Sequence, residues 1–229
     1  MEHILNHEKA HQKYFEEMTA IPHGSYHEQA YSAYLVAFAK EHGLKWIQDE
    51  LYNVIIYKDA SAGYEDHAPV LLQAHTDMVC EKNKDTDFDF EKDALKLYIE
   101  DGFLEARGTT LGADDGVGVA YMLALLSDPD AKHPPLECVF TVQEEVGLFG
   151  AMALKKEYFQ AKRMINLDDG GENATCTTSA GGVNVIMQKE RILVPHDGNG
   201  YQIDVFGLHG GHSGGEIAKE QGHGNTLLA

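Results

Sequence analysis

The hydrophobic and polar positions of the chain alternate between short strand-like runs and longer helical patterns. Strand character, with apolar and β-branched residues bounded by turn residues, is found at 54–57, 70–74, 95–99, 103–106, 137–142 and 164–167. Helical spacing of apolar residues is found before Ile21 and Pro22, from Ser25 onward, and at 116–126 and 148–159. Because strands that alternate with helices favour a sheet covered on both faces, the pattern predicts an α/β fold with a largely parallel, mixed sheet sandwiched by helices.

The ends of several elements carry local signals. Ser25 is expected to cap the second helix, and Glu28, three residues further on, completes a capping box. Asp101 and Gly102 lie between two strand-like segments, which predicts a β-hairpin. The segment at 116–126 is almost entirely apolar, which predicts a buried helix.

The character of the sequence changes beyond Gly181. Strand-like segments at 183–187 and 201–206 flank a polar stretch, and a glycine-rich segment follows at 207–217. We therefore expect a first domain over residues 1–181 and the beginning of a second domain over residues 182–229. The last residues, GNTLLA, are typical of the first turn of a helix, so we expect the chain to be part of a longer protein.

Charge and composition exclude several classes of function. The 229 residues include 18 basic and 37 acidic side chains, which gives a formal charge of -19. Such a chain repels phosphate backbones and anionic lipids, which argues against nucleic-acid and membrane partners. No stretch approaches the roughly 20 apolar residues of a membrane span, and the N-terminus lacks a signal-peptide core, so a cytoplasmic protein is expected. The three cysteines form no CxxC pair, which argues against a disulfide framework and a thiolate metal site.

Residue types that bind metals follow three of the predicted strands. His75 and Asp77 follow the strand at 70–74, Glu144 and Glu145 follow the strand at 137–142, and Asp168 follows the strand at 164–167. Because ligands bind at the carboxyl ends of strands in open α/β sheets, we expect these side chains to converge on one crevice. Nitrogen and carboxylate ligands suit zinc, with cobalt or manganese as replacements. If one glutamate binds metal, its neighbour Glu144 is free to act as general base.

Each of these features has a simpler explanation when taken alone. Adjacent glutamates are usually a solvated charge pair, and an aspartate after a strand is commonly a turn residue. Asp114, which precedes the buried helix in a glycine-flanked loop, is also what ordinary helix capping produces. Their joint placement after buried strands favours the metal site. In that arrangement the carboxylate of Asp114 bridges two ions, His75 and Asp168 bind one ion each, and Glu145 completes one of them. Asp77, two residues beyond His75, is expected to accept the other imidazole N–H.

Five motifs occur along the chain: HTDMV at 75–79, LGADDG at 111–116, EEVGLFGA at 144–151, NLDDGGE at 166–172 and GLHGGHSGGEI at 207–217. Together they resemble the M20 metallopeptidases, and they look most similar to the aminoacyl-histidine dipeptidases, also called Xaa-His dipeptidases or cytosolic non-specific dipeptidases. The resemblance covers nearly the whole chain. It implies a zinc-peptidase-like catalytic domain into which an α+β lid and dimerisation domain is inserted.

The resemblance also implies how two Zn²⁺ ions are held. His75 and Asp168 look like terminal ligands of the two ions, and Glu145 like a ligand that shares its ion with a histidine further along the chain. Asp114 looks like the bridging ligand, followed by a cis peptide bond to Asp115. In the family, the last histidine comes from the part of the catalytic domain that follows the lid, and nothing after Ala229 supplies it here.

For catalysis, the resemblance implies hydrolysis of dipeptides, Xaa-His and other unblocked ones, by a water that two zinc ions activate. Glu144 resembles the general base, Asp77 the orienting aspartate, and His212 the lid histidine that polarises the scissile carbonyl. Two alternatives stay open: an N-acyl amino acid amidohydrolase of the same fold, and a truncated, non-catalytic fragment. One expected partner is a small peptide substrate. The other is a second copy of the protein, because related lid domains form dimers.

Overall fold

The computed structural model describes residues 3–170, 173–179, 181, 185–195, 197–209 and 219–229. The chain divides into two compact units, Met1–Thr177 and Thr178–Ala229, and each is described by itself. A bilayer-spanning helix is absent from the part of the chain that the structure describes, since each helix there falls short in length or in apolar character. The predicted domain boundary between residues 181 and 182 stays a prediction.

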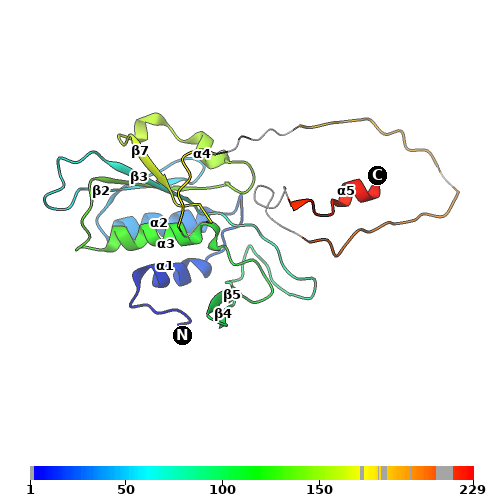
Figure 1. Cartoon of the computed structure of the whole chain (residues 1–229), viewed down its shortest axis with the longest axis horizontal. Helices are drawn as coiled ribbons and strands as arrows, with labels where there is room; N and C mark the ends of the chain where they lie inside the picture. Colours follow the sequence, from blue (N-terminus) through cyan, green and yellow to red (C-terminus); the bar gives the residue numbers. More distant parts are fainter. Residues whose placement is uncertain (1–2, 171–172, 180, 182–184, 196, 210–218) are drawn as a thin grey trace. The chain divides into compact units, whose positions relative to one another are not determined.

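A mixed five-stranded sheet forms the centre of the first unit (Figure 1). In spatial order its strands are β1 (Lys45–Gln48), β2 (Val54–Lys58), β6 (Leu136–Thr141), β3 (Val70–His75) and β7 (Arg163–Asn166). Strand β3 is parallel to β6 and to β7, whereas β2 is antiparallel to β1 and to β6. The prediction of a mixed sheet with helices is confirmed, but the parallel part is confined to β6, β3 and β7. Strand β1 was not predicted, because this short edge strand is largely exposed and shows no clear apolar run.

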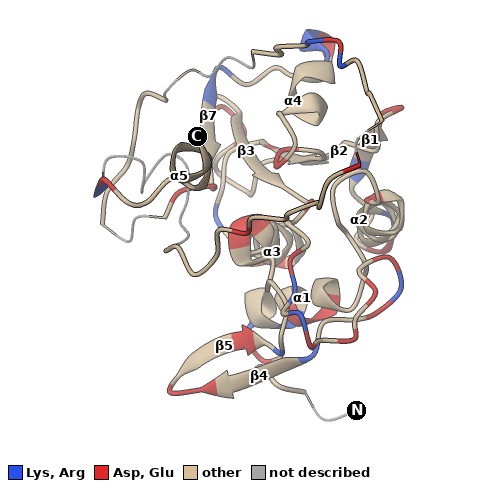
Figure 2. Cartoon of the chain, turned by 90° about the vertical axis from the view of Figure 1, so that its right-hand side faces the viewer, with Lys and Arg blue, Asp and Glu red and all other residues tan. Residues whose placement is uncertain are grey.

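Helices cover both faces of this sheet (Figures 1 and 2). Helix α2 (Gln29–Glu41) and helix α3 (Ala113–Ser127) lie on one face, and helix α4 (Phe149–Ala153) lies on the other. Helix α1 (Ala10–Thr19) packs on the outer side of α3. Strand β6 is buried along its whole length, and Val119, Met122 and Leu123 of α3 are fully buried, which confirms the predicted buried helix. Burial of apolar side chains between these layers stabilises the sheet that carries the site.

The predicted hairpin is confirmed. Strand β4 (Leu97–Glu100) pairs in antiparallel register with β5 (Phe103–Ala106), and Asp101 and Gly102 connect them with positive φ angles of 50° and 85°. Positive φ at both central residues is the geometry of a tight hairpin turn, which glycine and aspartate tolerate better than most residues.

Two predicted helix features are wrong. Helix α2 begins at Gln29, so Ser25 and Glu28 precede its first turn and form no capping box. The helix expected at 148–159 is much shorter: α4 ends at Ala153, where the extended backbone of Leu154 stops it, and a single 3₁₀ turn, η1 (Lys156–Tyr158), follows. Gly150 is the only buried residue of α4, so little apolar burial supports a longer helix.

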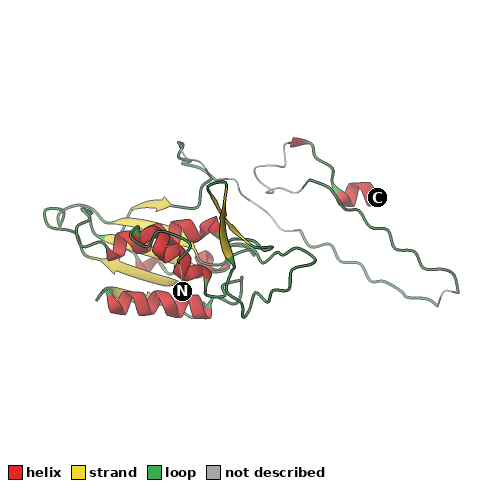
Figure 3. Ribbon diagram, turned by 90° about the horizontal axis from the view of Figure 1, so that it is seen from below, coloured by secondary structure: helices red, strands yellow, loops and turns green. Residues whose placement is uncertain are grey.

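The described residues of the second unit are mostly irregular (Figure 3). A short helix, α5 (Gly224–Leu228), confirms the helical turn predicted for GNTLLA. The strand predicted at 201–206 is wrong. Tyr201 and Phe206 are almost fully exposed, and a strand forms only where a partner strand satisfies its backbone groups. The strand predicted at 183–187 lies partly outside the described residues, and residues 185–187 are not in a strand.

Candidate metal centre

The carboxyl ends of three parallel strands bring the predicted site residues to one edge of the sheet. His75 is the last residue of β3 and pairs in register with Thr141, the last residue of β6. The segment after β6 carries Glu144 and Glu145, and the segment after β7 carries Asp168. This is the edge at which open α/β sheets bind ligands.

The start of α3 supplies the remaining acids, and Figure 2 shows it in red. Asp114 and Asp115 lie in the first turn of this helix, and the peptide bond between them is cis, as the family resemblance implied. Asp114 is largely exposed, with 65% of its side-chain surface accessible. Its carboxylate is therefore open to solvent and to a ligand.

The potential metal ligands form two overlapping groups. Donor atoms of His75, Asp114 and Glu145 all lie within 4.8 Å of one another, and so do those of His75, Glu144 and Asp168. The structure thus brings together the four predicted ligands and the predicted base. It groups Asp168 with Glu144 rather than with Glu145. Of the two remaining predicted site residues, Asp77 lies beside His75, and His212 lies outside the described residues.

The buried imidazole of His75 is held from both sides. Its Nδ1 lies 2.9 Å from the backbone oxygen of Asp77 and 3.5 Å from the carboxylate of the same residue. Its Nε2 lies 2.9 Å from Asp114 Oδ1 and 3.9 Å from Asp168 Oδ2. Asp77 lies beside one ring nitrogen, but its backbone oxygen rather than its carboxylate makes the shorter contact, and the other nitrogen faces the carboxylates of Asp114 and Asp168. A hydrogen bond at one nitrogen sets the tautomer and the orientation of the ring.

The carboxylate of Asp77 also organises the turn that follows β6. It accepts hydrogen bonds from the backbone N–H of Glu144 at 2.9 Å and of Glu145 at 3.2 Å, and from the Ser25 hydroxyl at 2.7 Å. Burial by itself raises the pKa of Asp77, but the contact with His75 and these hydrogen bonds outweigh burial and lower the pKa below its usual value. Asp77 therefore stays ionised and places both glutamates relative to His75.

Sequence reasoning missed the role of the segment before α2. Ser25 was interpreted as a helix cap, yet its hydroxyl contacts Asp77. Buried Glu28 accepts a hydrogen bond at 3.0 Å from the backbone N–H of Gln143, the residue just before Glu144. Both side chains therefore support the turn at the end of β6. No sequence signal distinguishes this use from a capping box, because the contacts span 52 and 115 residues.

The electrostatics of the site favour a cation. Burial raises the pKa values of Glu144, Glu145 and Asp168, and the neighbouring carboxylates raise them further. For His75, burial lowers the pKa, but Asp77 and Asp114 outweigh it and raise the pKa to about 10. One imidazole among six acidic side chains thus creates a strongly negative site. Two divalent ions would offset most of this charge, and their preferred imidazole and carboxylate donors are present.

Asp115 is a third residue whose position the sequence did not reveal. Its side chain is buried, Oδ1 accepts a hydrogen bond from the backbone N–H of Gly118 at 3.1 Å, and Oδ2 is buried without a hydrogen-bond partner. Burial is the main cause that raises its pKa to about 7. An unpartnered buried carboxylate oxygen is costly unless positive charge lies near, which again fits a centre that holds cations.

Comparison with known proteins agrees with this geometry. The profile of Peptidase family M20/M25/M40 matches residues 71–219, which include all the residues of the centre. The chain belongs to this peptidase family. The resemblance that the five motifs predicted is therefore confirmed, and the helix-flanked mixed sheet is that of an M20 catalytic domain.

Named relatives of this M20 peptidase chain include dipeptidases. The chain is 44% identical over 216 residues to the cytosol non-specific dipeptidase of Escherichia coli, covering 93% of this chain and 44% of that protein. The crystal structure of aminoacylhistidine dipeptidase from Vibrio alginolyticus matches with a TM-score of 0.68 and 41% identity, over 70% of this chain and 33% of that one. Aminopeptidase PepT from Bacillus cereus matches with a TM-score of 0.60 and 25% identity, over 74% of this chain and 45% of that one. The chain thus spans less than half the length of these relatives.

Proposed function

We propose that this chain carries most of the metal centre of a dipeptidase that hydrolyses unblocked dipeptides, Xaa-His among them. The observation that carries the proposal is the meeting of His75, Asp114 and Glu145 with Glu144 and Asp168 at one sheet edge. The dipeptidases named among the relatives support the choice of substrate class.

The donor set fits two zinc ions. Four ligands are proposed: His75 and Asp168 for separate ions, Asp114 as the bridge and Glu145 as a further ligand to one ion. When bound, two such ions lower the pKa of water and polarise a peptide carbonyl. Cobalt or manganese can take the same donors.

The residues around the ligands have separate roles in this proposal. Glu144 accepts a proton from the attacking water at its carboxylate as the new C–O bond forms, and delivers that proton to the amine nitrogen when the peptide C–N bond then breaks. Its raised pKa, caused first by burial, moves it toward the range in which a carboxylate can both accept and donate a proton. Asp77 acts as a positioning residue because it holds His75 and both glutamates. His212 is proposed to stabilise charge on the carbonyl oxygen.

The remaining parts of the proposal concern the whole protein. Residues 182–229 are proposed to begin a lid domain through which two copies dimerise. A cytoplasmic location is proposed from the name of the Escherichia coli relative.

The test compares dipeptide hydrolysis by the natural full-length protein with that of Glu144→Gln. The variant keeps the shape of the side chain but loses the proton acceptor, so we expect kcat to fall by about 10²–10⁴-fold while zinc content stays that of the wild type. Glu50→Gln, at an exposed position, is the matched control and should keep full activity. Normal kcat in Glu144→Gln would remove the general-base assignment. Absence of hydrolysis in a zinc-loaded wild type, over a panel of dipeptides, would remove the dipeptidase proposal.

A further inference from the structure

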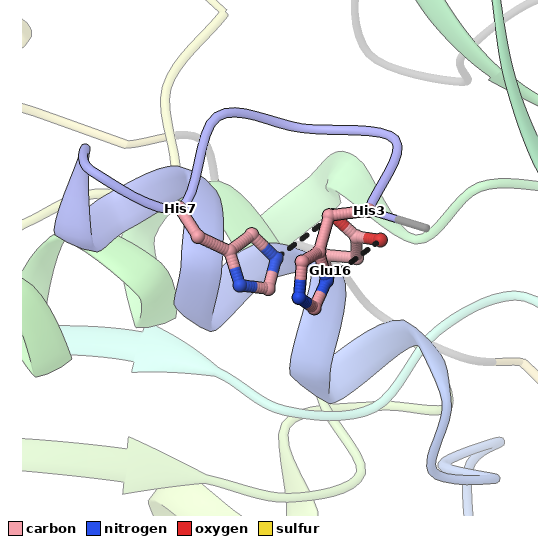
Figure 4. A group of neighbouring side chains, drawn as sticks. All are labelled: His3, His7 and Glu16. Carbon is pink, nitrogen blue, oxygen red and sulfur yellow. Dashed lines mark hydrogen bonds and ion pairs between the residues drawn. The ribbon is translucent and has the colours of Figure 1, made fainter. Parts of the chain in front are cut away.

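A second cluster of metal-binding side chains lies outside the proposed catalytic centre. His3 and His7 come from the segment before α1, and Glu16 comes from α1 itself (Figure 4). Donor atoms of the three residues all lie within 4.8 Å of one another. The two imidazole rings lie side by side near the Glu16 carboxylate, with ring centroids 3.6 Å apart.

Both imidazoles lie close to the Glu16 carboxylate. His7 Nε2 lies 3.0 Å from Glu16 Oε2, and His3 Nδ1 lies 3.9 Å from Glu16 Oε1. Two donors that each bind zinc at about 2.0–2.1 Å can lie at most about 4.2 Å apart, and each of these two pairs is closer than that. The longer contact exceeds a hydrogen bond, so hydrogen bonding alone does not explain why His3 lies there.

The Glu16 carboxylate is fixed in place and keeps binding capacity. The backbone N–H groups of Ile4 and Leu5 donate to its two oxygens at 3.0 and 2.9 Å. An ionised carboxylate offers about four lone-pair sites. Oε1 retains one of them for an ion, whereas Oε2 also contacts His7 Nε2 at 3.0 Å. These backbone contacts hold the carboxylate beside the two imidazoles.

The exposure of the cluster allows an ion to enter and the ligands to adjust. The His3 side chain is 58% exposed and that of His7 23%, whereas Glu16 is only 17% exposed. A small rotation of the exposed His3 ring can direct its nitrogen toward an ion held by the two more fixed residues. Solvent can fill the remaining coordination positions.

We propose that His3, His7 and Glu16 form a second metal site that binds one divalent transition-metal ion, with zinc as the ion to test. Two imidazoles and one carboxylate without thiolates are donors that zinc accepts readily. The bound ion joins the segment before α1 to the helix, and the two most distant ligands, His3 and Glu16, are 13 residues apart in the sequence. The ion therefore holds the N-terminal segment against the first unit. The site is independent of the proposed peptidase activity.

The first test is zinc stoichiometry at neutral pH, measured by elemental analysis after equilibration with a slight excess of zinc and gel filtration. We expect His7→Gln and His3→Gln each to bind one zinc fewer per chain than the wild type, or at least tenfold more weakly in calorimetric titration. His67→Gln changes an exposed histidine elsewhere and should bind as the wild type does. Circular dichroism checks that the variants fold, and the exposed position of His3 makes its variant the safer one.

The second test is amide hydrogen exchange of the segment before α1. Zinc should slow exchange at residues 4–8 in the wild type and in His67→Gln, and have no effect there in His7→Gln. Equal stoichiometry and equal protection in all variants would overturn the proposal, whatever the catalytic centre binds. Loss of one zinc in His67→Gln as well would identify non-specific binding to surface histidines and would equally overturn it.

Discussion

Asp77→Asn is the change that tests most directly how the centre is held together. The side chain of Asp77 is fully buried. Its two oxygens accept hydrogen bonds from the Ser25 hydroxyl and from two backbone N–H groups, and they lie near the ring of His75. Asparagine has the same shape but replaces one oxygen by an NH₂ group. Whichever oxygen is replaced, one backbone N–H, that of Glu144 or of Glu145, then faces a donor and loses its partner.

The sign and the size of the effect follow from these contacts. The pKa of Asp77 is lowered in the folded protein despite burial, so the fold stabilises the charged form and a neutral replacement destabilises it. One orphaned buried N–H costs about 1–3 kcal/mol, and the loss of charge weakens the remaining hydrogen bonds, for a total of roughly 2–5 kcal/mol. Since small domains are stable by about 5–15 kcal/mol, this is a large fraction of the whole.

The assay is urea unfolding followed by circular dichroism, with EDTA present so that metal affinity does not contribute. We expect the midpoint of Asp77→Asn to fall by about 1 M or more, given m-values of about 1–3 kcal/mol per molar urea. The midpoint of Ser25→Ala, which removes only one of the contacts, should fall less. Asp66→Asn, at an exposed position, is the control and should stay within about 0.5 kcal/mol of the wild type. If Asp77→Asn and Asp66→Asn have the same urea midpoint, the carboxylate does not hold the turn and our account of the site is wrong.

Two further predictions concern packing and pH. Gly150→Ala should destabilise the protein by about 1–3 kcal/mol, because the new methyl group would meet the Val142 backbone, including its nitrogen at 2.7 Å. Gly170→Ala is the control: its methyl group would enter open space, so its midpoint in the same urea assay should equal that of the wild type. Equal midpoints for the two variants would contradict the packing of α4 on the sheet. The pKa of His75 is raised from 6.5 to about 10, so its protonation stabilises the fold fully below pH 6.5 and this contribution is lost as the pH rises toward 10. In EDTA, the stability difference between wild type and His75→Gln should therefore shrink from pH 6.5 to pH 10, and a constant difference would refute the ion-pair explanation.

Most of the candidate site could be predicted from the sequence because its chemistry is local. His75, Glu144, Glu145 and Asp168 each follow an apolar strand, and parallel strands that share a sheet necessarily bring such ends together. The buried helix α3 and the β4–β5 hairpin were likewise predictable, since hydrophobic pattern and turn residues act over a few positions.

Only the tertiary structure decided which side chains support the site. Ser25 and Glu28 satisfy every local rule for a capping box, but their hydrogen bonds go to Asp77 and to the backbone of Gln143. The strand expected at 201–206 failed for the opposite reason, because a strand depends on a partner that its own residues do not specify. Local patterns determined the elements and the donor types of this protein, whereas contacts between distant segments determined how those donors are oriented, because a hydrogen bond across the fold leaves no periodic trace in the sequence.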